Sequence, residues 1–157
     1  MLQRLEELSW VVALNNSIPV SMALAVAHYV GFFLVVGTAV YVDLRILGVA
    51  GRGQGVRQLA EQLFPWWCIG FGFALVSGFI MFAAAADDYW AAGIFRCKVS
   101  VVLLAAISSI LVHGEARRWG QLPAMPMRAR IAAFISIVLW IGAILASVEV
   151  PAMSGLG

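Results

Sequence analysis

The stretch Ile18–Val42 reads IPVSMALAVAHYVGFFLVVGTAVYV and holds 25 consecutive residues without a charged side chain. About 20 residues of α-helix are enough to cross the hydrocarbon core of a bilayer. Three further uncharged runs follow along the chain: Leu63–Ala86, Val99–Gly114 and Ile131–Val148. The sequence therefore predicts four membrane-spanning helices, at about residues 18–48, 65–86, 95–118 and 129–149.

The composition of the whole chain agrees with a membrane protein. Of its 157 residues, 63% are hydrophobic and 11% are charged, whereas soluble chains carry about 25% charged residues. A net charge of +2 is too small for a nucleic-acid footprint, so no nucleic-acid partner is expected. None of the uncharged runs alternates like a barrel strand. We predict an all-α integral membrane protein, a single domain over residues 1–157 that forms an up-down four-helix bundle in the lipid bilayer.

Basic residues are distributed unequally between the two sides of the predicted spans. The loops after the first and third spans carry seven arginines: Arg45, Arg52, Arg57, Arg117, Arg118, Arg128 and Arg130. The opposite side carries only Arg4, Arg96 and Lys98, together with five acidic residues. By the positive-inside rule, both termini are expected in the periplasm, with the protein in the inner (cytoplasmic) membrane of a bacterium.

Segments beside the spans also have helical patterns. Leu2, Leu5, Leu8 and Val12 recur at helical spacing, which predicts an amphipathic helix over about residues 2–14 on the outer membrane surface. Residues 56–64 are expected to form a separate short interfacial helix, because Pro65 suits the first turn of a span. Five aromatic residues are expected to form belts at the two interfaces: Trp66, Trp67 and Trp119 inside, Tyr89 and Trp90 outside.

The only two histidines, His28 and His113, lie in predicted spans, where an ionisable group suggests a functional site. Gly31 lies one turn from His28 and is expected to leave room for a flat ligand. Small residues also precede His113 at intervals of four. These features suggest axial ligation of haem b iron by both histidines. The alternative is structural: each histidine hydrogen-bonds to a neighbouring helix, and the small residues serve helix packing.

The two histidines are expected at different depths in the membrane. His28 precedes Asp43 by 15 residues, whereas His113 precedes Arg117 by four. The difference corresponds to about 16 Å of helix, so one iron cannot be bound by both histidines of one chain. The sequence therefore predicts two separate haem sites.

Basic residues near each depth are candidates to bind the haem propionates. Arg96 and Lys98 suit an outer haem on His28, and Arg45 or Arg117 suits an inner haem on His113. The sixth ligand is open between water, a methionine such as Met22 or Met81, and the equivalent histidine of a symmetry-related subunit.

Asp43 and Arg45 lie near the inner end of the first span. A carboxylate at that depth is normally paired, and His113 or an arginine of the third span lies at a compatible depth. We expect Asp43 and Arg45 to take part in a structural ion pair, with a step in proton conduction as the alternative. Cys68 and Cys97 are expected near opposite membrane faces and therefore unbridged. No motif for a catalytic nucleophile or a zinc site is found, so the sequence assigns no catalytic residue.

From His28 to Val150, the order of features resembles a group of bacterial four-helix inner-membrane proteins of unknown function. The resemblance includes the Asp43–Gly48 stretch DLRILG, the Pro65-Trp66 pair and Lys98. Family members often carry Asn in the third helix, where this chain has Ser108 and Ser109. The resemblance implies the four-helix fold and places both histidines and Lys98 at recurrent polar positions.

Two functions are consistent with these patterns. One is a small haem-bearing, cytochrome b-like electron-transfer subunit with outer and inner haem sites. The other is a non-catalytic accessory or assembly subunit of a larger membrane complex, in which the histidines are structural. Small-residue stripes on the first two spans favour a homo-oligomer or membership of a complex in both cases.

Overall fold

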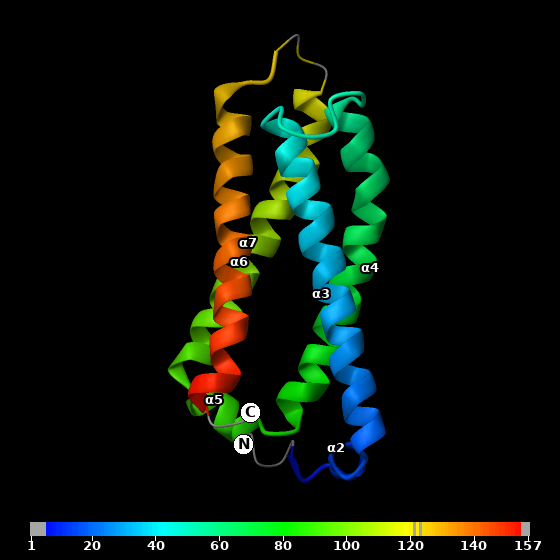
Figure 1. Cartoon of the computed structure of the whole chain (residues 1–157), viewed down its shortest axis with the longest axis vertical. Helices are drawn as coiled ribbons and strands as arrows, with labels where there is room; N and C mark the ends of the chain where they lie inside the picture. The colour runs from blue at the N-terminus through cyan, green and yellow to red at the C-terminus, as the bar shows by residue number, and fades with distance from the viewer. Residues whose placement is uncertain (1–5, 121, 123, 155–157) are drawn as a thin grey trace.

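The computed structural model describes residues 6–120, 122 and 124–154 and contains helices but no strand within that part of the chain. The helices are α2 (Ser9–Asn15), α3 (Ile18–Ile46), α4 (Val56–Ala83), α5 (Ala86–Ala91), α6 (Gly93–Trp119) and α7 (Met127–Ser154). Four of them, α3, α4, α6 and α7, are long and apolar enough to cross a membrane. The predicted all-α membrane bundle is confirmed (Figure 1).

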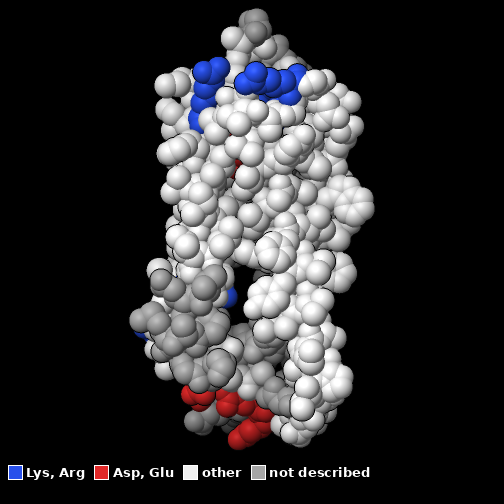
Figure 2. Space-filling model, viewed as in Figure 1, with Lys and Arg blue, Asp and Glu red and all other residues white. Residues whose placement is uncertain are grey.

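The four long helices form two antiparallel pairs. Helix α3 packs along α4, and α6 packs along α7, while α3–α7 and α4–α6 contacts join the pairs (Figure 1). The loops after α3 and α6 lie at one end, and α2, α5 and the end of α7 lie at the other. Arginine side chains gather at the first of these ends, and Asp and Glu gather at the second (Figure 2). We call them the basic end and the acidic end.

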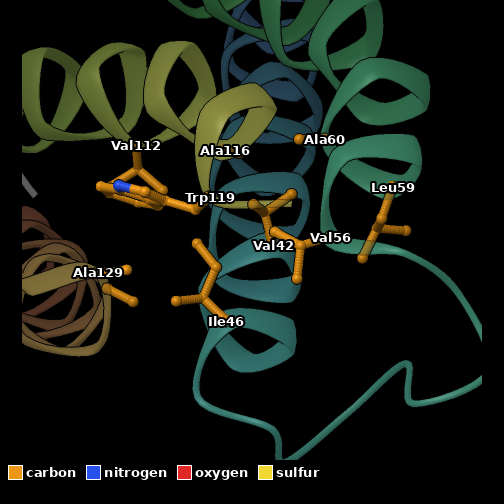
Figure 3. Close-up of a cluster of buried hydrophobic side chains, with 10 residues drawn as sticks. Val42, Ile46, Val56, Leu59, Ala60, Val112, Ala116, Trp119 and Ala129 are labelled. Atoms are coloured by element: carbon orange, nitrogen blue, oxygen red, sulfur yellow. The ribbon is translucent and has the colours of Figure 1, made fainter. Parts of the chain in front are cut away.

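Helix α4 runs without interruption from Val56 through Pro65, so the predicted separate interfacial helix over residues 56–64 is wrong. Its first turns are held inside the bundle, because Val56, Leu59 and Ala60 pack against α3 and α6 (Figure 3). At the acidic end, α4 stops at Ala83 and the short helix α5 makes the turn into α6. Helix α2 begins at Ser9, and residues 2–5 of the predicted surface helix lie outside the described residues.

The packed core fills only part of the length of the bundle. One cluster of buried side chains lies near the basic end, and a second surrounds Trp67 and Trp140. Together the clusters extend to Phe32 on α3, Phe71 on α4, Val101 on α6 and Ala143 on α7. Beyond that level an opening separates the two helix pairs (Figure 2). We call it the acidic-half opening.

Two residues expected in the inner aromatic belt belong to the core instead. Trp67 and Trp119 are buried, so their assignment to the membrane interface is wrong, whereas Trp66 is 55% exposed. The indoles of adjacent residues on a helix point in different directions, so the two neighbouring tryptophans face different surroundings. The indole of Trp67 therefore packs in the interior of the bundle.

Candidate functional site

The ring of His28 on α3 is oriented by α4. Its Nδ1 lies 3.0 Å from the carbonyl oxygen of Ala74 and 3.2 Å from Oγ of Ser77. Because a carbonyl only accepts hydrogen bonds, Nδ1 carries the proton and donates it, which leaves the lone pair on Nε2. Gly78 leaves room for the ring itself, since a Cβ there would lie 2.9 Å from its Cε1.

His28 lies on the face of α3 that points into the bundle. Towards the acidic end, Ser21 and Leu24 on this face line a cavity of 170 Å³ together with Met81 of α4. Towards the basic end, Phe32 meets the ring of Trp140 edge-on. His28 therefore lies between a small cavity and the last layer of the packed core.

Lys98 reaches the same region from the other helix pair. It is half-buried on α6, and its charge contributes to the electrostatic environment of His28. Among the described residues it forms no ion pair. Lys98 is thus a half-buried lysine on the helix pair opposite His28.

Other residues predicted at haem sites lie elsewhere. The Arg96 guanidinium donates to the carbonyl oxygen of Trp90 over 3.3 Å, and Nε of Arg45 donates to that of Gln54 over 2.7 Å. The expectation that Gly31 leaves room for a flat ligand is wrong. A Cβ at Gly31 would lie 2.7 Å from the amide nitrogen of Ala74 and 2.8 Å from the carbonyl oxygen of Gly70, so α4 fills this space.

His113 lies in the packed half of the bundle and is 5% exposed. Its Nδ1 donates to the carbonyl oxygen of Ser109 over 2.8 Å, while Oγ of Ser109 accepts from Nε1 of Trp140 over 2.9 Å. Its Nε2 is buried and has no hydrogen-bond partner. The ring centroids of Phe64 and Trp67 lie 5.5 and 6.3 Å from the centroid of the His113 ring.

The contacts with α4 confirm that the histidines lie at different depths. His28 contacts Ser77, whereas His113 lies beside Trp67, ten residues earlier on the same helix. Ten helical residues span about 15 Å. The packed core ends near the level of His28. A haem does not fit beside His113, because the surrounding space is filled by buried side chains of all four long helices.

The predicted ion pair between Asp43 and Arg45 is wrong. Asp43 is buried, whereas the Arg45 side chain turns towards the loop after α3. Residues two apart on a helix do not face each other, which explains the separation. The polar side chain that acts on the Asp43 carboxyl is Ser136 of α7, a residue that sequence reasoning missed. The feature of the sequence that could have indicated Ser136 is a hydroxyl group inside an apolar span.

Comparisons with known proteins add no assignment: no protein-family model, curated protein or solved structure matches the chain. The family resemblance of the sequence therefore stays a prediction. The features that bear on function are the geometry around His28 and the buried polar groups His113, Asp43 and Ser136.

Proposed function

We propose that the chain is an electron-transfer subunit that would bind one haem b in the acidic-half opening, held through Nε2 of His28. The observation that carries this proposal is the state of the His28 ring: Nδ1 is committed to Ala74, and the lone pair is on Nε2. Metal-binding histidines characteristically donate through their other nitrogen to a carbonyl or carboxylate. When bound, haem b would supply one-electron oxidation and reduction.

The positive charge of Lys98 favours an anionic ligand in this opening. A half-buried ammonium group in an apolar bundle is costly without a partner, and among the described residues no carboxylate pairs with it. A haem propionate would provide that charge. Met81, which lines the adjacent cavity, is a second side chain that would help to hold the group.

His113 is not part of this proposal, so the two haem sites expected from the sequence are reduced to one. A carrier of one haem must exchange electrons with other redox centres. We therefore place the protein in a larger membrane complex or a homo-oligomer, where the haems of neighbouring subunits provide such centres.

The test compares reduced-minus-oxidised visible spectra of the parent protein and two matched variants, His28→Asn and His113→Asn. Asparagine retains a donor for the backbone carbonyl but removes the metal-binding nitrogen, so both variants keep much of the native hydrogen bonding. We expect haem bands in the parent, at least a tenfold lower haem content in His28→Asn, and bands close to the parental intensity in His113→Asn.

Two results would contradict the proposal. A colourless, well-folded parent purified from haem-replete cells would exclude haem and favour an accessory subunit with structural histidines. Equal loss of haem from both variants, with size-exclusion profiles like that of the parent, would instead indicate a haem site at each depth.

We also propose that the basic end faces the cytoplasm of a bacterial cell and that both termini are periplasmic. The separation of charge between the two ends supports this orientation (Figure 2). In a Cys68→Ser, Cys97→Ser background, Asp88→Cys is expected to react with a membrane-impermeant maleimide in cells with a permeabilised outer membrane. Gly53→Cys is expected to react only after the inner membrane is opened. The reverse pattern would invert the topology.

A further inference from the structure

The buried carboxyl group of Asp43 has no counter-charge. It is 1% exposed in the interior of the bundle, and its Oδ2 has no hydrogen-bond partner. Ser136 of α7 acts on the carboxyl, but its Oγ has no partner at ordinary hydrogen-bond distance. Oδ2 of Asp43 and Oγ of Ser136 are thus both buried without a partner at ordinary hydrogen-bond distance.

The charged side chains near Asp43 interact with other partners. On its own helix, Arg45 donates to the carbonyl oxygen of Gln54. On α4, Glu61 pairs with Arg57 and with Arg117 of α6, at 3.0 and 3.5 Å. Among the described residues, no cation pairs with Asp43.

The other buried titratable side chain among the described residues, His113 on α6, does not supply a proton to Asp43. Its Nδ1 proton goes to the carbonyl oxygen of Ser109, and its Nε2 has the lone pair. On α7 the neighbouring polar group is the Ser136 hydroxyl, which stays neutral. The interior around Asp43 thus contains acceptors and a hydroxyl but no positive charge.

An ionised carboxylate without a cation or a full set of donors is strongly disfavoured in a low-dielectric interior. We propose that Asp43 is a reversible proton-binding site, in which a proton from the basic-end solution binds to Oδ2 and Ser136 hydrogen-bonds to the resulting acid. The carboxylate takes up one proton, forms one O–H bond and becomes neutral, so no other reactant is needed. This inference does not depend on haem binding.

The proton is expected to reach the Asp43 carboxyl from the basic end. Asp43 lies three residues before the last residue of α3, a rise of about 4.5 Å. In the opposite direction the second core cluster, with Trp140 and Trp67, lies between this carboxyl and the acidic-half opening. The proton site and the proposed haem site are therefore separated by packed apolar side chains.

Infrared spectroscopy of the full-length protein in lipid at neutral pH tests the proposal. We expect a carboxylic-acid C=O band that shifts on transfer to D₂O, shifts again when aspartate is labelled with ¹³C at the side-chain carbonyl, and is absent in Asp43→Asn. Ser136→Ala is expected to retain the band at a higher frequency, because the hydrogen bond to the acid is lost. Asp88→Asn, which alters an exposed aspartate at the acidic end, is the matched control and is expected to leave the band unchanged.

Absence of an aspartate-derived acid band in the labelled parent would overturn the proposal without the use of any variant. Persistence of the band in folded Asp43→Asn would also overturn it, since the proton would then be on another residue. An unchanged frequency in Ser136→Ala would contradict the role of Ser136. Failure of Asp43→Asn to fold would not affect the isotope measurement, which uses the native chain.

Discussion

Replacement of Gly31 by alanine is expected to lower the free energy of unfolding by about 3 kcal/mol, the upper end of the usual cost of overpacking. The added methyl group would lie 2.7 and 2.8 Å from backbone atoms of Ala74 and Gly70, which cannot rotate away as a side chain can. Helices α3 and α4 would have to separate. The variant should lose helicity at a lower SDS fraction than the parent, as followed by circular dichroism.

Gly37→Ala is the matched control for this prediction. Gly37 lies on the same helix with nothing within 4 Å of an added Cβ. Its replacement should be neutral or stabilising by up to about 1 kcal/mol, because alanine is the better helix former. Equal stability of both variants would show that the close approach of α3 and α4 does not determine the stability of the bundle.

Trp140→Ala is expected to have a similar cost, about 3 kcal/mol, at the lower end of the range for large aromatic residues. Trp140 is 1% exposed, contacts Phe32 edge-on and donates to Oγ of Ser109. The lower end applies because the hydrophobic driving force is weak for a helix already in lipid, so the loss consists mainly of packing and the hydrogen bond. The same SDS titration measures it.

Two controls separate the contributions at Trp140. Trp140→Phe keeps a ring but leaves the Ser109 hydroxyl without its donor, so a loss of about 1–2 kcal/mol is expected. Trp66→Ala removes an indole that is 55% exposed on the outside of the bundle and should have a much smaller effect. A Trp66→Ala loss as large as that of Trp140→Ala would contradict the assignment of Trp140 to the core.

The surroundings of the two histidines depend on contacts between helices that are distant in sequence. His28 and His113 were recognisable as candidates, because ionisable groups in apolar spans are conspicuous. Which of them had space for a ligand depended on where the core ends, and this depends on the packing of all four helices. Gly31, predicted to make room for a ligand, instead allows close contact with Gly70.

Asp43 illustrates the same limit for charged groups. Depth at the inner end of the first span suggested an ion pair that included Arg45, but the helix directs residues two apart to different sides. Its observed neighbour, Ser136, is 93 residues away in the sequence and on another helix. No property of either local segment specifies that pairing.

The sequence by itself determined the four spans, their alternating direction and the separation of charge between the two ends. A membrane-spanning helix satisfies its own backbone hydrogen bonds and needs only a sufficiently long apolar run, so it is a local property of the chain. Only the tertiary structure decided that α4 continues through Pro65, that His113 is enclosed while His28 borders an opening, and that Asp43 faces a serine. These features depend on the register and rotation of one helix against another, which are set by van der Waals contacts between segments distant in sequence.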